Sequence, residues 1–290
     1  MLTNATLSFI GSGVMGEAMI RGILAQRLIE PEAITASDPL SDRLQTLRGR
    51  YDIRTTTDNL AAARAGKITV LSVKPQTLPK ILPEIREGIG ADNLVISIVA
   101  GAPIGRIQRG LGAEKIVRAM PNTPGQIGHG MTVWTATPAV DEIGRRQAQA
   151  ILGALGKEIL VDDEGYLDMA TALSGTGPAY VFLFMEALID AGVHMGFSRR
   201  VAQELVYQTI EGSVAIARAT GAHPTELRNQ VTSPGGTTAE ALYQLEKGSF
   251  RTVISKAIWA AYQRSRTLGE VADKAGDKST DKATDKAGDK

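Results

Sequence analysis

The sequence predicts an α/β fold, in which a doubly wound parallel sheet is followed by an all-helical domain. Short β-like runs alternate with helical stretches through the first half, and several runs, such as I-T-V-L-S-V at 68–73, are almost wholly apolar. Such runs are typical of parallel strands that helices cover on both faces. After about Asp162 no convincing strand follows and long helical patterns take over, which indicates a second, all-α domain.

The strand candidates of the first half are short runs rich in Val, Ile, Leu and Thr, bounded by turn residues. They lie at 7–10, 33–37, 68–73, 94–99, 116–118, 131–135 and 158–161. The clearest helix candidates between them are 15–26, 78–89 and 142–155. We expect these elements to form one domain over residues 1–163.

The second half consists of helical segments, which we place at 166–173, 179–195, 199–220, 224–230, 238–246 and 250–268. The segment 179–195 is apolar on nearly every face apart from Glu186 and Asp190, so we expect it to be buried within one subunit or between two. We therefore predict a helical domain over 164–272 that forms dimers through its helices.

The composition excludes several classes of function. The 32 Lys and Arg residues nearly balance the 31 Asp and Glu residues, so a net charge of +1 gives no general reason to bind nucleic acid or anionic membrane. The absence of cysteine excludes disulfides, thiolate metal sites and a cysteine nucleophile, and the three histidines lie far apart. We expect no nucleic-acid partner and no metal.

The two ends of the chain suggest a compartment and a tail. The N-terminal apolar run, 7–10, is too short for a signal sequence and no basic segment precedes it. The richest apolar segment, 180–185, falls short of the roughly 20 residues of a membrane span, so we expect a cytoplasmic protein without membrane contact. Residues 273–290 hold five Asp, five Lys and nothing more apolar than Ala, which predicts a disordered tail.

A glycine-rich turn follows the first predicted strand and opens a helix; it reads Gly11, Ser12, Gly13, Val14, Met15, Gly16. In this context the spacing G-x-G-x-x-G is the fingerprint of a Rossmann-type dinucleotide site. The first Gly allows the tight turn, the second lets the pyrophosphate approach the backbone, and the third lets the helix pack on the strand. The helix N-terminus offers N–H groups and a positive dipole to the phosphates.

The residues after the second strand leave the choice of dinucleotide open. Asp38 lies about 20 residues after the glycine turn, where an acid would hold the adenosine ribose of NAD. Ser37, Ser41 and Arg43 are near enough to receive the 2′-phosphate of NADP. Asp38 could equally cap the next helix, since Pro39 suits a first helical position.

Other segments also have the composition of a binding site. Three further strand ends, V-L-S-V-K-P-Q at 70–76, I-S-I-V-A-G at 96–101 and R-A-M-P-N-T-P-G at 118–125, fall where ligands of doubly wound sheets bind. In the helical half, we expect a polar loop at 172–180 and a carboxylate site in V-T-S-P-G-G-T-T-A-E-A-L at 231–242. Two glycines and two threonines at a helix start supply N–H groups, hydroxyls and a dipole without a basic side chain.

Together these segments resemble pyrroline-5-carboxylate reductase, from about Leu7 to Leu268 and in the order of that family. The segments that carry the resemblance are F-I-G-S-G-V-M-G-E-A-M-I-R-G, V-L-S-V-K-P-Q, I-S-I-V-A-G, R-A-M-P-N-T-P, S-G-T-G-P-A-Y-V-F and V-T-S-P-G-G-T-T. The resemblance implies NAD(P)H-dependent reduction of 1-pyrroline-5-carboxylate to L-proline, the last step of proline biosynthesis. It also implies a homodimer or a higher homo-oligomer, and it favours NADP (NADPH) while leaving NAD possible.

The resemblance further implies which residues form the site. The cofactor residues are Gly11, Ser12, Gly13, Val14, Met15, Gly16, Ser37, Asn59, Ser72, Val73, Lys74, Pro75, Val99, Ala100 and Gly101. The substrate residues are Ser233, Gly236, Thr237 and Thr238, and Thr238 resembles the catalytic hydroxyl that hydrogen-bonds the ring nitrogen. Two features depart from the family pattern: S-D-P-L-S-D-R lacks the Ser-Arg pair of many NADP-preferring relatives, and the Asp/Lys tail has no counterpart.

The chemistry expected of an imine fits the absence of catalytic acids. Reducing a ketone leaves an alkoxide that needs a proton donor, whereas reducing a protonated cyclic imine leaves a neutral amine. Residues 158–246 contain no lysine, and we expect His194 and His223 to be structural. Two alternatives are a reductase of another cyclic imine or an oxo acid, and a non-catalytic dinucleotide sensor, in which the 231–242 site would have no purpose.

Overall fold

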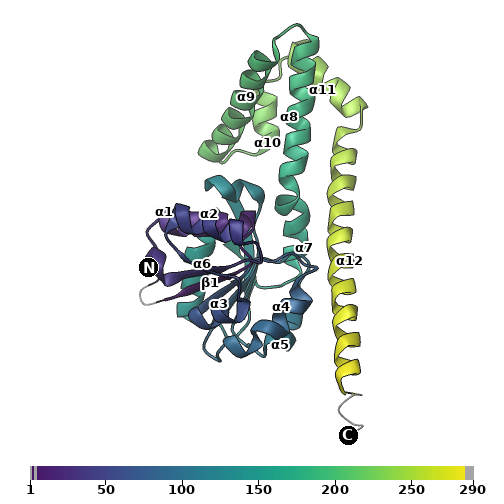
Figure 1. The fold of residues 1–290 in the computed structure, drawn as a ribbon. Coiled ribbons are helices and arrows are strands. Elements are labelled where there is room, and N and C mark those ends of the chain that lie inside the picture. The colour runs from purple at the N-terminus through teal and green to yellow at the C-terminus, as the bar shows by residue number, and fades with distance from the viewer. Residues whose placement is uncertain (1, 3–4, 285–290) are drawn as a thin grey trace. The chain divides into compact units, whose positions relative to one another are not determined.

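The computed structural model describes residue 2 and residues 5–284, with side chains described as far as residue 269. The chain divides into two compact units (Figure 1): unit 1 comprises Met1–Thr176 together with Ala261–Lys290, and unit 2 comprises Gly177–Ala260. The boundaries that the sequence predicts, after residues 163 and 272, differ from this division. The reason is that residues 166–170 pack against β6 and β7, and that the last helix contacts Asp168 and Gly101 of unit 1 through Ser265 and Leu268.

Unit 1 is built on an eight-stranded sheet of order β3-β2-β1-β4-β5-β6-β7-β8. The strands are β1 (Leu7–Ile10), β2 (Ile34–Ser37), β3 (Arg54–Thr56), β4 (Ile68–Leu71), β5 (Leu94–Ser97), β6 (Ile116–Met120), β7 (Gly130–Ala136) and β8 (Gly156–Leu160). The predicted parallel pairing is confirmed from β1 to β6 but is wrong for β7, which runs antiparallel to β6. The link from β6 to β7 has only residues 121–129, and a parallel crossover needs a dozen or more.

Helices cover both faces of this sheet, as its apolar strands predict (Figure 1). One face packs α1 (Val14–Ala25), α2 (Ser41–Tyr51) and α6 (Glu142–Gly153), and the other packs α3 (Asn59–Ala65), α4 (Leu78–Ile85) and α5 (Ile104–Leu111). Successive strand residues enter different hydrophobic clusters: Phe9 packs in the first and Ile10 in the second. This alternation is the pleat of a strand that is buried on both sides.

A helical stretch, and not the predicted polar loop, occupies most of residues 172–180. Helix α7 (Tyr166–Ala170) continues through a π-helical turn at Thr171–Gly175. The hydroxyls of Thr171, Ser174 and Thr176 donate to the carbonyls of Leu167, Ala170 and Thr171, at 2.7, 3.0 and 2.8 Å. Because these hydroxyls bond back to the preceding turn of backbone, the polar residues are accommodated within a helix.

The C-terminal helix α12 (Phe250–Thr284) is longer than the sequence predicts. In unit 1, Ser265 donates to Asp168 at 2.7 Å and Leu268 lies beside Gly101; Figure 1 shows this part of α12 on the side of α4 and α5. The predicted disordered tail, 273–290, instead begins as helix and remains helical to Thr284. Ala and Lys favour helix, and elongating an existing helix needs no new nucleus. Residues 285–290 lie outside the described residues.

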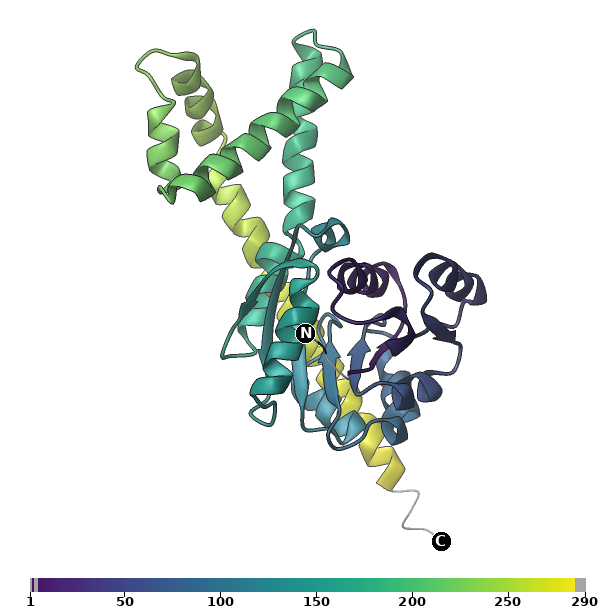
Figure 2. The same cartoon turned by 90° about the vertical axis from the view of Figure 1, so that its left-hand side faces the viewer.

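Unit 2 contains α8 (Gly177–His194), α9 (Arg199–Thr220), α10 (Pro224–Gln230), α11 (Thr237–Lys247) and the start of α12. Helices α8 and α9 form a hairpin (Figure 2), in which a Cβ on Gly192 would lie 3.0 Å from Ala202. Within α8, which the structure describes in full, the buried residues are Ile189 and Gly192. The burial expected for this helix is therefore not found inside one chain, and burial between two chains stays open.

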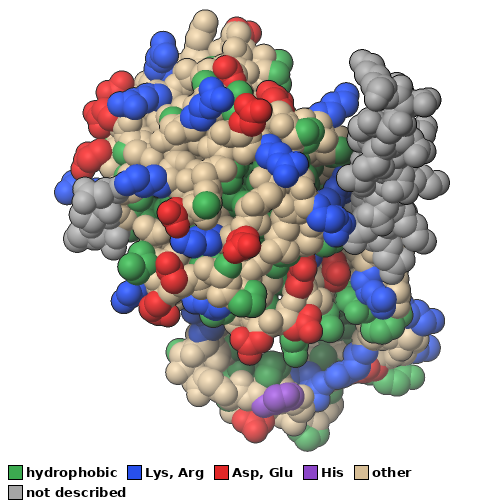
Figure 3. Space-filling model, turned by 90° about the horizontal axis from the view of Figure 1, so that it is seen from below, with side chains coloured by type: hydrophobic (Ala, Val, Ile, Leu, Met, Phe, Trp, Pro, Cys, Tyr) green, Lys and Arg blue, Asp and Glu red, His purple; other side chains and the backbone are tan. Residues whose placement is uncertain are grey.

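A broad apolar surface results from this exposure. By length and composition alone, the helical stretch Tyr166–His194 could cross a membrane, although a core helix meets the same test. The large exposed side chains of α8 and α9 are Val181, Phe182, Leu183, Phe184, Leu188, Val193, Leu205, Tyr207, Val214 and Ile216. On the face shown in Figure 3, by contrast, basic and acidic side chains are intermixed, as expected for a chain of nearly balanced charge.

Candidate functional site

The glycine-rich turn connects β1 to α1 and shows a different constraint at each of its three glycines. Gly11 has φ +86°, and a Cβ there would lie 2.7 Å from Val73 Cγ1. A Cβ on Gly16 would lie 2.9 Å from the carbonyl oxygen of Gly11. At Gly13, no described atom lies within 4 Å of the Cβ position. Gly11 and Gly16 are thus required by close packing within the fold, while Gly13 leaves free space in front of the backbone.

Ser12 is the point where the ends of β1 and β2 are tied together. Its N–H donates to Asp38 Oδ2 at 3.1 Å, and its hydroxyl donates to the Ser37 carbonyl at 2.9 Å. Arg43 Nε donates to the Ser12 carbonyl at 2.7 Å. The other carboxylate oxygen of Asp38 accepts from the Leu40 N–H at 3.0 Å. A carboxylate and a guanidinium therefore bind one residue of the turn through its N–H and its C=O.

Glu17, in the first turn of α1, gathers three side chains of α2. Its carboxylate is 2.6 Å from Arg43 Nη2 and 3.0 Å from Arg50 Nη1, and it accepts from the Tyr51 hydroxyl at 2.9 Å. Burial by itself raises the pKa of Glu17, but the hydrogen bonds from Arg43 and Tyr51 and the charge of Arg43 outweigh it and hold that pKa below its ordinary value. Burial and the neighbouring carboxylate raise the pKa of Tyr51.

Three of the predicted cofactor residues lie around the glycine-rich turn: Ser37, Asn59 and Ser72. The Ser37 hydroxyl donates to Asn59 Oδ1 at 2.7 Å, and Asn59 Nδ2 donates to Glu84 at 3.1 Å. The Ser72 hydroxyl donates to the carbonyl of Gly11. Because β2, β1 and β4 are neighbours in the sheet, their carboxyl ends bring these predicted residues together.

The remaining predicted cofactor residues are more varied in environment. Lys74 and Pro75 lie in an exposed turn in which the Thr77 N–H donates to the Lys74 carbonyl at 2.9 Å. The Val99 side chain is 3% exposed and packs in the core, so only its backbone can face a ligand. Ala100 is exposed and Gly101 has φ +64°, which places a tight turn beyond β5, next to β4 in the sheet.

The second group of predicted residues forms a turn and a helix start in unit 2. Gly236 N–H donates to the Ser233 carbonyl at 3.1 Å, and Gly235 has φ +70°. Gly236 is the N-cap of α11, and a Cβ there would fall on the Ser233 hydroxyl. The N-cap makes no side-chain capping hydrogen bond in the described structure, and Thr237 and Thr238 are the first two helical residues. The arrangement can bind an anion through N–H groups and hydroxyls.

The two histidines with predicted structural roles lie at helix ends. His223 is the N-cap of α10, and its Nδ1 accepts from the Thr225 N–H at 3.2 Å. His194 is the last residue of α8. Among the residues that the structure describes, no group of three or more His, Cys, Asp or Glu side chains could hold a metal.

Sequence reasoning missed two charged groups near the strand ends. One is Glu17, since nothing in the G-x-G-x-x-G pattern marks the residue that follows it. The other is a partly buried ion pair in which Arg118 Nη1 lies 2.6 Å from Glu164 Oε1, which also accepts from the Ile104 N–H at 2.8 Å. Arg118 stands within the quoted R-A-M-P segment, but its partner Glu164 lies far away in sequence.

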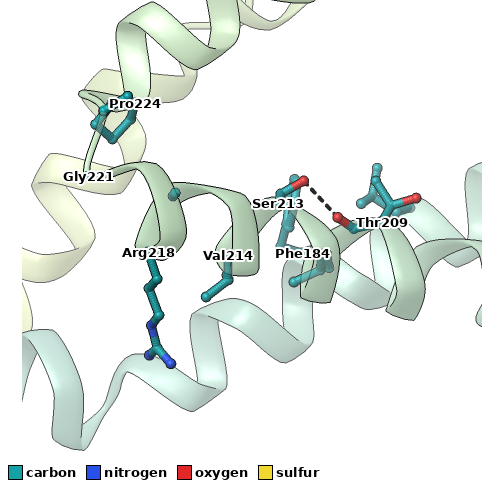
Figure 4. A pocket seen from close by; sticks show the side chains of 11 residues that line it. Phe184, Thr209, Ser213, Val214, Arg218, Gly221 and Pro224 are labelled. Atoms are coloured by element: carbon teal, nitrogen blue, oxygen red, sulfur yellow. Dashed lines mark hydrogen bonds between the residues drawn. The ribbon is translucent and has the colours of Figure 1, made fainter.

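One hollow of unit 2 is lined by none of the predicted site residues. It is open, measures about 640 Å³, and is lined by α8, α9 and the start of α10 (Figure 4). Phe184, Leu188 and Val214 line it, and the Ser213 hydroxyl donates to the Thr209 carbonyl of its own helix at 2.7 Å. An apolar hollow of this kind is an unpartnered helix surface rather than a place for proton transfer.

Comparison with known proteins covers both units. Residues 164–268 match the family model described as pyrroline-5-carboxylate reductase dimerisation, and residues 6–101 match the one described as NADP oxidoreductase coenzyme F420-dependent. The pyrroline-5-carboxylate reductase of Synechocystis sp. is 42% identical over 91% of this chain and 98% of its own length. That of Arabidopsis thaliana is 36% identical over 91% and 95%, respectively.

A solved structure gives the same result at the level of the fold. The crystal structure of Plasmodium falciparum pyrroline carboxylate reductase with NADP bound is 36% identical, has a TM-score of 0.84 and covers 92% of this chain and 98% of its own. Likeness of this extent, through the glycine turn and the helical segment alike, settles the relationship that the sequence motifs suggested. The chain belongs to the pyrroline-5-carboxylate reductase family.

Proposed function

We propose that this protein reduces 1-pyrroline-5-carboxylate to L-proline with NADPH, the last step of proline biosynthesis. The observation that carries the proposal is that the likeness to pyrroline-5-carboxylate reductases extends over more than nine-tenths of the chain. It therefore includes both the glycine turn and the 231–242 segment. A dinucleotide sensor would need only the first of these.

The cofactor half of the proposal is supported by the space around the glycine turn. When bound, NADPH supplies the hydride. The free space before Gly13 and the N-terminus of α1 suit its pyrophosphate. The other residues that we assign to the cofactor are Gly11, Ser12, Val14, Met15, Gly16, Ser37, Asn59, Ser72, Val73, Lys74, Pro75, Val99, Ala100 and Gly101.

The substrate half is supported by the start of α11. We assign the substrate carboxylate to the N–H groups and hydroxyls at Ser233, Gly236 and Thr237, and the ring nitrogen to the hydroxyl of Thr238. The first N–H groups of a helix lack intrahelical partners, so they can donate hydrogen bonds to an anion without the help of a lysine or arginine. Catalysis then rests on positioning a carbon that is already electrophilic, because the imine is protonated.

The test is reductase activity of the purified full-length chain with 1-pyrroline-5-carboxylate, followed by the oxidation of NADPH. Thr238→Ala should lower kcat by about 10²-fold, as expected for a lost hydrogen bond to the reacting group, while the Kd of NADPH stays within about twofold. Thr225→Ala is the matched control, because Thr225 occupies the second position of α10 as Thr238 does of α11. Absence of NADPH oxidation by the wild type would refute the function, and a simultaneous loss of cofactor binding would refute the role of Thr238.

We also propose that the protein is a homo-oligomer assembled through unit 2. The exposed apolar side chains of α8 and α9 and the dimerisation family model over 164–268 support it. Leu183 is 66% exposed in the single chain, and we propose that a second subunit covers it. Leu183→Asp would place a charge in that interface, so the mass measured by sedimentation should fall. Ile143→Asp on α6 is the control, and an unchanged mass for Leu183→Asp would contradict the proposal. The cytoplasmic location stays a prediction.

A further inference from the structure

The turn that follows β5 is held at both of its ends. Where it begins, the Val99 N–H donates to the buried Ser97 hydroxyl at 3.3 Å. Where it ends, the Ile104 N–H donates to Glu164 Oε1 at 2.8 Å. The residues between, 99–103, connect the strand to α5 and include three that we assign to the cofactor.

Glu164 supplies the capping acceptor that α5 lacks in its own N-cap. That N-cap is Pro103, whose side chain has no polar atom, and Ile104 is the first helical residue. The first N–H groups of a helix have no intrahelical partner, and an acid at this end also meets the positive end of the helix dipole. The carboxylate therefore fixes the start of α5 from a segment 60 residues further along the chain.

The same carboxylate joins the start of α5 to β6. Its Oε1 also accepts from Arg118 Nη1 at 2.6 Å, and the buried Arg118 is the partner of Ser97 in the pairing of β6 with β5. Helix α7, which follows Glu164, contacts β6 and β7, and its Asp168 accepts from Ser265 of α12 at 2.7 Å. One oxygen atom thus connects a residue beside the start of the turn with the residue at its end.

The place of this turn in the sheet assigns it to one half of a dinucleotide. In a doubly wound sheet the two halves of such a cofactor bind on either side of the point where the strand order reverses. Here that point lies between β1 and β4, so the adenosine half would lie beyond β1 and β2, and the nicotinamide half beyond β4 and β5. A backbone that contacts the reacting ring has to be held to within about 0.5 Å, because hydride transfer depends on the alignment of the two reactants.

We propose that Glu164 is a positioning residue for hydride transfer: through the Ile104 N–H and Arg118 it holds the 99–103 turn in the place where the nicotinamide binds. The inference rests on the proposed function, which assigns part of this turn to the cofactor. In this role Glu164 acts through the backbone of the turn and exchanges no proton with the substrate.

The first test is amide hydrogen exchange of the full-length protein, without cofactor or substrate. Glu164→Ala removes the acceptor of the Ile104 N–H, so exchange in peptides that cover 98–104 should become about tenfold faster or more. Glu164→Gln keeps an acceptor and should stay within about threefold of the wild type. Glu158→Ala is the matched control, because Glu158 of β8 also accepts two side-chain hydrogen bonds, and it should leave exchange in 98–104 unchanged.

The second test follows the oxidation of NADPH in a single turnover with 1-pyrroline-5-carboxylate. Glu164→Ala should lower the rate constant about tenfold, because the ring is no longer aligned, while the KM of the imine changes less than about twofold. Glu164→Gln should recover most of the rate, and Glu158→Ala should keep all of it. A loss of folded enzyme alone would reduce the amplitude of this phase and not its rate constant.

The inference fails if exchange in 98–104 is unchanged in Glu164→Ala, or if exchange rises while the rate constant stays at the wild-type value. A wild type that does not oxidise NADPH with the imine refutes the proposed function instead. Binding then decides the inference: Glu164→Ala should weaken NADPH about threefold relative to 2′,5′-ADP, which has no nicotinamide. An unchanged ratio of these two affinities would overturn it.

Discussion

Alanine at Gly11 and at Gly13 should separate the stability of the glycine turn from its ligand binding. At Gly11 the φ of +86° costs an L-residue about 1–2 kcal/mol, and moving Val73 from 2.7 Å adds about 1–3 kcal/mol. We therefore expect Gly11→Ala to destabilise the fold by roughly 2–5 kcal/mol. At Gly13, φ is −65° and space is open, so the weaker N-cap and the gain in unfolded-state entropy nearly cancel.

The effect of Gly13→Ala should appear in binding. Its methyl group would fill the space that we assign to the pyrophosphate, so NADP⁺ and NAD⁺ should both weaken about tenfold or more, a free-energy loss of about 1.4 kcal/mol or more. Urea unfolding at one fixed protein concentration measures stability, and titration calorimetry measures affinity. Wild-type affinity in a folded Gly13→Ala protein would show that the pyrophosphate binds elsewhere.

Two charged clusters yield further predictions. Because the pKa of folded Glu17 is lowered, its charge stabilises the fold fully above its ordinary pKa of 4.5, and this contribution disappears as the pH falls through the folded pKa. The stability difference between wild type and Glu17→Gln in urea should therefore shrink below about pH 4.5; a constant difference from pH 7 to pH 3 would contradict the assignment. Glu164→Ala leaves Arg118, 7% exposed, without its acceptor and should cost about 3 kcal/mol, whereas Glu164→Gln keeps an acceptor and should cost about 1–2 kcal/mol. Equal losses, measured by urea unfolding, would exclude a role for the charge.

Local patterns were sufficient for most of the fold. Helix α9 has the predicted bounds, because Ser198 caps its start through the Val201 N–H and Gly221 ends it in the left-handed conformation. The strand β3 was missed, since R-T-T at 54–56 has no apolar residue and is stabilised by pairing with β2. The direction of β7 follows from its short link to β6, and the π turn at 171–175 contains hydroxyls that bond back to the preceding turn of backbone; hydrophobic periodicity reports neither feature.

The exposed α8 shows where a single sequence reaches its limit in another way. Its apolar faces predict a buried helix, but they cannot tell burial within a chain from burial between chains. The structure leaves Phe182 and Leu183 60% and 66% exposed, so this need is not met inside unit 2. Only the second subunit that we propose would meet it, and that partner is absent from the local pattern.

In the cofactor site, too, some features follow from neighbouring residues in the sequence and others from residues far apart in it. The roles of the glycines depend on neighbours that the G-x-G-x-x-G spacing already encodes, and their geometry agrees with it. The charged side chains beside the turn instead depend on contacts that this spacing does not encode: Asp38 and Arg43 bind the two backbone groups of Ser12, and Glu17, from another helix, pairs with Arg43. Each of these residues has an ordinary explanation when read alone. Their arrangement around Ser12 exists only in the folded chain, because it joins the starts of α1 and α2 and the end of β2, which are separate segments of the sequence.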